Sequence, residues 1–203
     1  MKILIATKNE GKVEEIKALL EDLDLEILTL NKNFPSLKLP PESYLGFEYN
    51  ALTKARYTAL NTGVTAIADD SGLEVDALGG MPGVRSARYA GPDATDEENC
   101  TKLLEKMKGI PPERRTARFR CVIALVAPSG RDEETFEGTL EGVIGTEPRG
   151  RHGFGYDPIF VLPETGKTLA ELSPEDKNRI SHRAKALNKL KKRLAERLKQ
   201  LAK

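Results

Sequence analysis

The stretch Thr65-Ala66-Ile67-Ala68-Asp69-Asp70-Ser71-Gly72 decides the fold. Its first four residues, of which Ala66, Ile67 and Ala68 are apolar, predict a buried central strand that stops at Asp69. The two adjacent carboxylates that follow repel each other unless a cation or hydrogen-bond donors compensate their charge. The simpler interpretation is a turn in which aspartate and serine cap a helix.

Outward from this strand, the chain alternates predicted strands and helices. Apolar or alternating runs predict strands over residues 3–6, 25–30, 117–126, 135–144 and 159–162, with residues 128–130 as a hairpin connection. Helical spacing and capping residues predict helices over about 12–22, from 47 to a stop at 61–63, from Thr95 or Asp96 to Met107, from Ser173, and over 187–201. Proline and glycine predict loops over 33–41 and 79–83. The pattern indicates a mixed α/β fold without a linker, and we treat residues 1–203 as a single domain.

The composition is typical of a globular protein, and the net charge is too small to indicate a nucleic-acid partner. Apolar residues make up 39% and charged residues 31% of the 203, and the formal net charge is +1. No apolar stretch approaches the roughly 18 residues of a membrane helix, and the N-terminal run is too short for a signal peptide. The two cysteines, Cys100 and Cys121, suit a reducing compartment. We therefore expect a cytoplasmic protein with no stable nucleic-acid partner and no membrane association.

The first strand leads into a turn that could bind an anion. Thr7-Lys8-Asn9-Glu10-Gly11-Lys12 opens a helix, where free backbone N–H groups would meet the charges of Lys8 and Lys12. The turn lacks the G-x-x-x-x-G-K-[ST] pattern of a Walker A loop. An ordinary strand–helix turn capped by Asn9 is the alternative.

Further polar residues could join the acidic pair. Asp69 and Asp70 offer the oxygen ligands that Mg²⁺ prefers, and Glu42 could deliver another ahead of the second helix. Successive strand residues point to opposite faces, so both aspartates need not reach one ion. On the second helix, Asn50 and Lys54 lie four residues apart and could both reach a phosphate, although solvated helix polarity is the more frequent explanation.

The C-terminal half offers groups that could recognise a flat ligand. Gly153-Phe154-Gly155-Tyr156-Asp157-Pro158 combines flexible backbone, aromatic faces and a carboxylate, and its alternative is a glycine-rich turn with two core aromatics. His182 and Arg183 could donate to a keto oxygen, whereas a histidine at a helix start is more often a cap or surface group. The basic run from Lys185 to Lys199 could contact RNA, but the leucines opposite it favour a solvated amphipathic face.

Taken together, these segments resemble the inosine triphosphatase-like family of non-canonical purine NTP pyrophosphatases, the XTP/dITP diphosphatases. The matching pieces occur in family order from Ile3 to about Leu190, and they are residues 6–12, 68–73, 77–89, 153–160 and 177–183. One departure is clear. The usual Phe-x-Glu-Asn-Ala stretch reads Phe47-Glu48-Tyr49-Asn50-Ala51, so no metal ligand is assigned at Tyr49.

The resemblance implies an activity, a fold and a set of site residues. The activity is hydrolysis of ITP, dITP or XTP to the monophosphate and pyrophosphate, which cleanses the nucleotide pool. The fold is an elongated α/β fold with a mixed twisted sheet and flanking helices, in two lobes with a central cleft, and the assembly is a homodimer. By motif position, Thr7, Lys8, Asn9, Glu10, Gly11, Lys12 and Lys54 would hold the triphosphate, and Glu42, Asp70 and Asp69 would hold Mg²⁺. Asp70 would also accept a proton from water, Ser71 would contact substrate, and Phe154, Gly155, Tyr156, Asp157, Lys177, His182 and Arg183 would form the base pocket.

Three other functions stay open at this point. A pyrophosphatase for modified pyrimidine or alkylated nucleotides would use a similar fold. An RNA-binding module would use the basic final helix, but it leaves Asp69 and Asp70 without a role. A nucleotide sensor without catalysis would bind ITP and release no product.

Overall fold

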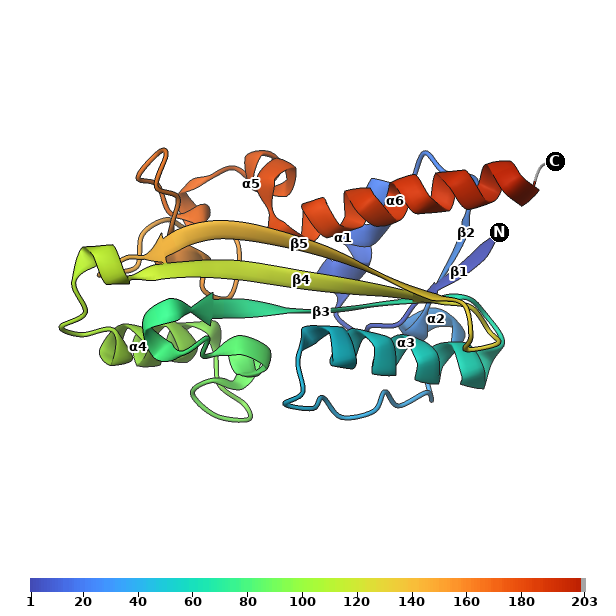
Figure 1. Ribbon diagram of the computed structural model, residues 1–203, viewed down its shortest axis with the longest axis horizontal. Coiled ribbons are helices and arrows are strands. Elements are labelled where there is room, and N and C mark those ends of the chain that lie inside the picture. The colour runs from blue at the N-terminus through green and yellow to red at the C-terminus, as the bar shows by residue number, and fades with distance from the viewer. Residues whose placement is uncertain (202–203) are drawn as a thin grey trace. The chain divides into compact units, whose positions relative to one another are not determined.

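The computed structural model describes residues 1–201 and contains a six-stranded sheet in the order β2-β1-β3-β4-β5-β6 (Figure 1). The strands are β1 (Lys2–Ile5), β2 (Glu26–Thr29), β3 (Ala66–Val75), β4 (Thr116–Val126), β5 (Glu133–Ile144) and β6 (Phe160–Val161). The helices are α1 (Glu10–Leu20), α2 (Leu30–Asn33), α3 (Phe47–Thr62), α4 (Asp96–Lys106), α5 (Pro174–Ile180) and α6 (His182–Leu201). β1 runs parallel to β2 and β3, while β6 is antiparallel to β5. The expected mixed α/β sheet with flanking helices is therefore confirmed.

The chain divides into two compact units whose boundaries fall inside regular elements. Unit 1 comprises Met1–Asp70, Cys121–Gly138 and the chain from Lys185, and unit 2 comprises Ser71–Arg120 and Thr139–Ala184. The divisions therefore cut β3, β4, β5 and α6, which explains why no linker is visible in the sequence. Residues 202 and 203 of the predicted single domain lie outside the described residues.

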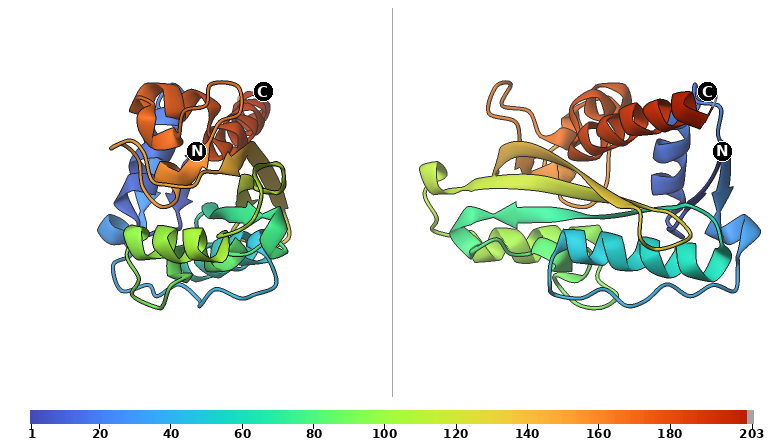
Figure 2. Two further views of the ribbon diagram at one scale, coloured as in Figure 1. Left: turned by 90° about the vertical axis from the view of Figure 1, so that its left-hand side faces the viewer. Right: turned by 45° about the vertical axis from the view of Figure 1, so that its right-hand side comes forward.

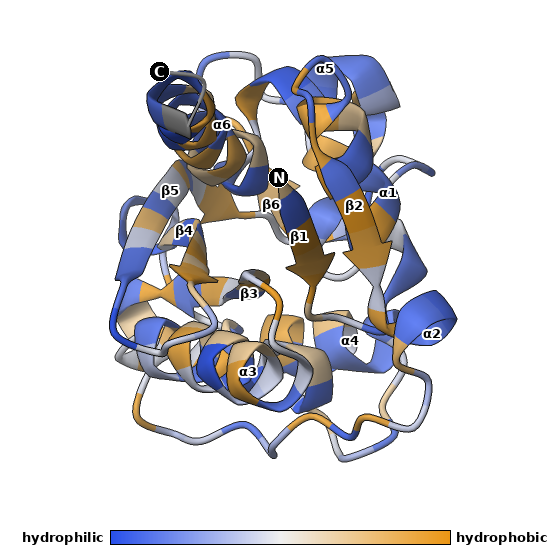
Figure 3. Cartoon of the chain, turned by 90° about the vertical axis from the view of Figure 1, so that its right-hand side faces the viewer, coloured by the Kyte–Doolittle hydropathy of each residue, from blue (hydrophilic) through white to orange (hydrophobic). Residues whose placement is uncertain are grey.

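The core of unit 1 is built from strands β1, β3 and β4 against two helices. Helix α1 contributes Val13, Ile16 and Leu20, at the spacing that places them on one face. Helix α6 contributes a second apolar stripe, and its hydrophobic and hydrophilic residues alternate around the axis (Figure 3). Helix α3 lies on the other side of these strands (Figures 1 and 2), where its fully buried alanines allow close approach. These alanines are Ala51, Ala55 and Ala59.

The core of unit 2 is a separate cluster. The strands supply Leu73, Phe119 and Ile144, helix α4 supplies Leu103 and Met107, and β6 closes the cluster with a fully buried Phe160. Gly142 on β5 permits this packing. A Cβ atom there would stand 2.5 Å from the Phe160 ring, so that any larger residue forces β6 away.

Most predicted helix ends are confirmed, because their signals are local. Asn9 accepts a hydrogen bond from the backbone N–H of Lys12, so α1 begins two residues before the predicted start. Thr95 and Glu98 form a capping box at α4, and Ser173 caps α5. α3 ends at Gly63 in the left-handed region, as glycine permits.

The predicted end of the central strand is wrong. β3 does not stop at Asp69 but continues through Asp69, Asp70, Ser71 and Gly72 to Val75. The interpretation of these residues as a helix-capping turn is therefore also wrong. The physical reason is that cationic and amide side chains from α1 and α3 compensate both carboxylates.

Candidate functional site

The two adjacent aspartates of β3 have different partners in unit 1. The Asp69 carboxylate forms an ion pair with Lys12 of α1, at 2.7 Å between Nζ and Oδ2. The Asp70 carboxylate contacts α3 instead, where Asn50 Nδ2 donates at 2.9 Å and Lys54 Nζ donates at 3.1 Å. This is the alternation expected of neighbouring strand residues, because α1 and α3 cover opposite sides of the strand.

Asn50 and Lys54 are buried, so their interpretation as solvated helix polarity is wrong. Asn50 is 2% exposed and Lys54 is 8% exposed. Asn50 also exchanges hydrogen bonds with the backbone of Ser43, which fixes the loop ahead of α3. Lys54 reaches the carboxylate of Glu42 in the same loop at 3.3 Å. The ammonium of Lys54 thus bridges the carboxylates of Glu42 and Asp70.

Burial and the neighbouring charges together set the protonation behaviour of this cluster. It raises the pKa of Asp70 above its ordinary value, against the lowering effect of the Lys54 charge and the Asn50 hydrogen bond. Burial by itself lowers the pKa of Lys54, but the three nearby carboxylates outweigh it, Asp70 most of all, and leave that pKa above its ordinary value. Lys54 therefore stays charged, while Asp70 becomes a better proton acceptor than an ordinary surface aspartate.

The turn between β1 and α1 only partly faces this cluster. Lys12 reaches Asp69, and Asn9 caps the helix, as the simpler interpretation expected. Lys8 Nζ donates instead to the carbonyl oxygen of Pro35, at 3.2 Å. Glu10 accepts a hydrogen bond from Asn31 of α2. The turn is thus anchored to α2 and the following loop on one side and to β3 on the other.

A second cluster of predicted residues lies within unit 2. Asp157 is 3% exposed, and its Oδ2 accepts from the backbone N–H of Phe154 at 2.9 Å and from Lys177 Nζ at 2.5 Å. Burial raises the pKa of Asp157, and the charge of Lys177 opposes that rise. Gly153 is required here, because it adopts φ 81° and a Cβ atom would collide with the Asp157 carboxylate.

The two aromatic side chains of this loop behave differently. Tyr156 is buried and its hydroxyl donates to the carbonyl oxygen of Ser86 at 2.8 Å, as a core aromatic would. Phe154 is 54% exposed, with Lys177 Nζ 4.3 Å and the Arg183 guanidinium carbon 5.8 Å from its ring centroid. The interpretation of both aromatics as core residues is therefore wrong for Phe154, whose ring is open to a ligand.

His182 and Arg183 are buried at the start of α6, so the surface interpretation of His182 is wrong. The imidazole of His182 stacks on Phe119, with ring centroids 4.9 Å apart and an interplanar angle of 11°. Arg183 Nη2 donates to Ser71 Oγ at 3.3 Å. Arg183 thus links the residue after Asp70 to the aromatic loop of unit 2.

Ten of the predicted site residues form one cluster in each unit. Unit 1 gathers Lys12, Glu42, Lys54, Asp69 and Asp70, and unit 2 gathers Ser71, Phe154, Asp157, Lys177 and Arg183. The sequence analysis considered Asn50 as a possible phosphate contact without assigning it to the site, and in the structure it holds the Asp70 carboxylate. Its signal in the sequence was the four-residue spacing to Lys54. Within residues 1–201, no three carboxylate, histidine or cysteine side chains come together as a ready-made metal site.

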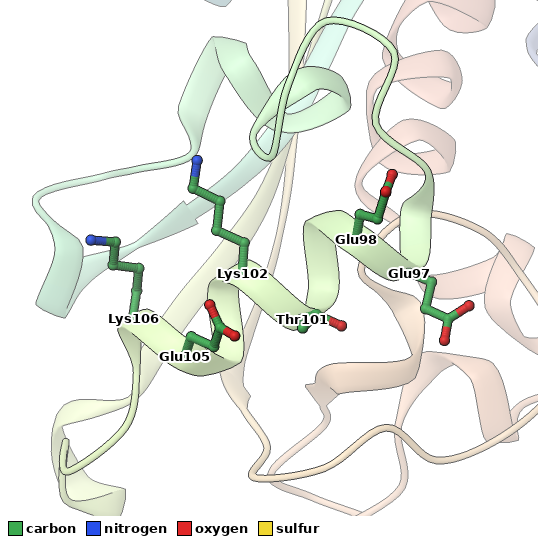
Figure 4. A pocket seen from close by; sticks show the side chains of 6 residues that line it. All are labelled: Glu97, Glu98, Thr101, Lys102, Glu105 and Lys106. Carbon is green, nitrogen blue, oxygen red and sulfur yellow. The ribbon is translucent and has the colours of Figure 1, made fainter.

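Two other features do not join these clusters. A hollow of about 430 Å³ lies along α4 and is lined by Glu97, Glu98, Thr101, Lys102, Glu105 and Lys106, none of which was a predicted site residue (Figure 4). In the basic run of α6, Arg193 and Arg197 pair with Glu134, and Lys191 pairs with Asp22. These ion pairs favour the solvated amphipathic face over an RNA surface.

No helix among the described residues is long and apolar enough to cross a membrane.

Comparison with known proteins places these motifs in a family. The model of the Ham1 family matches residues 3–193. The chain is 53% identical over 188 residues to the dITP/XTP pyrophosphatase of Geobacillus kaustophilus, covering 93% of this chain and 91% of that protein. It is 53% identical over 190 residues to the protein of the same name from Thermus thermophilus, covering 94% and 90%. The solved structure of a HAM1 protein from Coxiella burnetii matches with a TM-score of 0.91 and 43% identity, covering 97% of this chain and 99% of that chain. The chain therefore belongs to the Ham1 family, which confirms the resemblance seen in its motifs.

Proposed function

We propose that this protein hydrolyses non-canonical purine nucleoside triphosphates, namely ITP, dITP and XTP, to the nucleoside monophosphate and pyrophosphate. The relatives named dITP/XTP pyrophosphatase support the reaction class. The observation that carries the proposal in this chain is the buried Asp70 carboxylate, held by Asn50 and Lys54. The raised pKa of this carboxylate makes it a stronger proton acceptor than a surface aspartate, as a general base requires.

In this proposal, unit 1 binds the triphosphate and unit 2 binds the base. The turn from Thr7 to Lys12 supplies backbone N–H groups at the start of α1, and Lys12 and Lys54 supply positive charge. Asp70 accepts the proton of a water molecule whose oxygen attacks the α-phosphorus. The bond from the α-phosphorus to the bridging oxygen then breaks, and pyrophosphate leaves with that oxygen.

The charge of the unit 1 cluster supports a divalent cation as part of the site. Three carboxylates (Glu42, Asp69 and Asp70) lie with two ammonium groups (Lys12 and Lys54), and the formal charges of these five side chains sum to −1. A triphosphate would be repelled by this charge unless a cation accompanied it. Oxygen donors are the ligands that Mg²⁺ prefers, and one or two carboxylates suffice when phosphates complete its shell. We therefore propose that Asp70 and Glu42 bind Mg²⁺, with Asp69 as an additional ligand; the ion would neutralise phosphate charge and polarise the reacting phosphoryl group.

Unit 2 supplies the groups that would distinguish purines. The exposed Phe154 ring offers a stacking surface for the base, and Lys177 and Asp157 border it. Hypoxanthine and xanthine carry a 6-keto oxygen, which accepts hydrogen bonds from His182 and Arg183. Adenine carries an amino group there, which would leave the donors unpaired, and a mismatch of this kind discriminates strongly.

We also propose that the protein acts as a cytoplasmic homodimer, with the outer face of α3 at the interface. Exposed apolar side chains gather on α3 and the loop before it, which is unusual for a solvated helix. Those with the greatest exposure on this surface are Tyr44, Leu45, Tyr49, Tyr57 and Leu60.

Product analysis tests the reaction directly. ITP incubated with the protein and Mg²⁺ should yield IMP and pyrophosphate in equal amounts, and excess EDTA should abolish the reaction because the cluster alone is negatively charged. ATP should be turned over far more slowly. Release of orthophosphate and IDP would contradict the proposed cleavage, and full activity in EDTA would contradict the metal dependence.

The variant Asp70→Asn tests the proton acceptor. We expect kcat to fall by about 10²- to 10⁴-fold, the usual contribution of a general base. The fold should persist.

The same variant has an expected effect on stability. Because the folded-state pKa of Asp70 is raised, the wild type loses stability as pH rises from 3.8, the ordinary pKa of an aspartate, through the folded-state pKa, and the variant does not. Urea unfolding should therefore show the stability of the variant, relative to wild type, increasing with pH across that window. Asp22→Asn, on the surface of unit 1, is the control, and near-normal turnover in Asp70→Asn would exclude the assigned role.

The variant Arg183→Ala tests base recognition. Loss of the guanidinium donor should reduce the ratio of kcat/KM for ITP over ATP by about tenfold or more, because a hydrogen bond from a charged donor is lost. Arg179→Ala, whose side chain is 79% exposed on α5, is the matched control. Selectivity that stays unchanged in Arg183→Ala would remove this residue from the recognition scheme.

The double variant Tyr57→Glu, Leu60→Glu tests the dimer surface. Two charges on an apolar interface should convert the dimer to a monomer in sedimentation velocity, because buried unpaired carboxylates are costly. Met81→Glu, at an exposed apolar residue of unit 2, should leave the dimer intact. A wild-type protein that sediments as a monomer, or a double variant that remains dimeric, would contradict the proposal.

A further inference from the structure

Two side chains of α4 hold the backbone of Gly155, in the middle of the aromatic loop of unit 2. The Asp96 carboxylate accepts a hydrogen bond from the Gly155 N–H, at 2.6 Å between N and Oδ2. The Cys100 thiol donates to the Gly155 carbonyl oxygen, at 3.3 Å between Sγ and O. Asp96 and Cys100 lie four residues apart, so they project from the same face of the helix. Both hydrogen-bonding groups of one glycine are thus occupied by one helix.

Gly155 separates two aromatic side chains that point to different surroundings. Tyr156 is anchored in the core through its hydrogen bond to Ser86, while Phe154 is exposed beside Lys177. Gly155 adopts φ 61°, a conformation that makes this divergence of neighbouring side chains accessible to the chain. The conformation must be held in place, because glycine alone has the largest conformational freedom of any residue.

The backbone on each side of Phe154 is therefore fixed by a separate contact. Its own N–H donates to the Asp157 carboxylate at 2.9 Å. The next peptide group, which contains the Gly155 N–H, is held by Asp96. Since the direction of the Cα–Cβ bond follows from these two peptide groups, the contacts set where the Phe154 ring stands.

We propose that Asp96 and Cys100 are positioning residues, which orient the Phe154 ring for stacking on the purine base without touching the base themselves. The inference rests on the proposed function of unit 2. It assigns α4 a role in nucleotide recognition, although no residue of this helix was among the predicted site residues.

The chemistry of both groups suits hydrogen bonds to Gly155 that persist at neutral pH. Burial, followed by the neighbouring acidic residues, raises the pKa of the Cys100 thiol to about 12, so the thiol keeps its proton and remains a donor at neutral pH. Asp96 is not needed to cap α4, because Thr95 and Glu98 already form the capping box. The Asp96 carboxylate is thus available for the loop.

The experiment compares Asp96→Ala with Glu97→Ala. Both remove one acidic side chain from the first turn of α4, so both lose the same favourable interaction with the helix dipole, but only Asp96 contacts Gly155. Glu97 lies at the same end of the helix, on the hollow of Figure 4. We expect Asp96→Ala to raise KM for ITP by about tenfold, the lower end for a charge-assisted hydrogen bond since Asp96 is exposed, with kcat within about twofold. Glu97→Ala should leave both constants unchanged.

Conservative variants separate positioning from folding. Asp96→Asn keeps an acceptor oxygen and Cys100→Ser keeps a hydroxyl donor, so each should recover most of the affinity that Asp96→Ala or Cys100→Ala loses. Amide hydrogen exchange at Gly155 should accelerate in Asp96→Ala and stay at the wild-type rate in Glu97→Ala. If Asp96→Ala fails to fold, Cys100→Ala tests the contact to the Gly155 carbonyl oxygen, and we expect a raised KM for ITP there as well.

The outcomes distinguish this proposal from the proposed function. An equal rise in KM for Asp96→Ala and Glu97→Ala, a KM at the wild-type value in Asp96→Ala, or unchanged exchange at Gly155 would each overturn the positioning role. A wild-type protein that releases no pyrophosphate from ITP would instead refute the proposed reaction. In that case the dissociation constant of ITP, measured by calorimetry, replaces KM in the same comparison.

Discussion

The ion pair between Lys54 and Asp70 is the interaction on which the rest of the site depends. Both side chains are buried, and two charges removed from water are stable only when they compensate each other and their remaining hydrogen-bonding capacity is used. Asn50 satisfies the second oxygen of Asp70, and Glu42 gives Lys54 a second partner. Removing the Lys54 charge would leave the Asp70 carboxylate buried without a cation, whereas removing the Asp70 charge would leave Lys54 its ion pair with Glu42. The pair therefore fixes α3 against β3, and it places the loop that carries Glu42 as well.

This compensation also explains the path of the chain. Two adjacent aspartates would ordinarily end a strand, yet β3 continues because α1 neutralises Asp69 and α3 neutralises Asp70. The continued strand carries the chain from unit 1 into unit 2 at the peptide bond between Asp70 and Ser71. The residue proposed to accept the proton is thus followed directly by a residue that Arg183 contacts in unit 2. Asp70 and Ser71 thus lie at the boundary of the two units and also belong to the proposed site.

The sequence predicted those features whose causes are local. Caps such as Asn9 and Thr95 satisfy backbone groups three residues away, so their identity is sufficient to place a helix start. The end of β3 was predicted wrongly because its cause lies 16 residues away in sequence, in Lys54 on another element. Phe154 and Tyr156 could not be separated either. They are two residues apart in one motif, and only the tertiary partner of Tyr156 shows which aromatic belongs to the core.

The two clusters differ in the sign of their charge, and this difference matches the two ends of the proposed substrate. In unit 1, the formal charges of three carboxylates outnumber those of two ammonium groups, and in the proposed function this is why a divalent cation accompanies the polyphosphate. In unit 2, the cluster contains two cationic side chains, Lys177 and Arg183, and the single carboxylate of Asp157. Hydrogen-bond donors are therefore in excess around the Phe154 ring. A neutral base rich in keto oxygens fits an excess of donors and needs no metal. In the proposed function, the cation would therefore serve the phosphate end alone, and 6-keto bases would be distinguished from adenine by hydrogen-bond complementarity around Phe154.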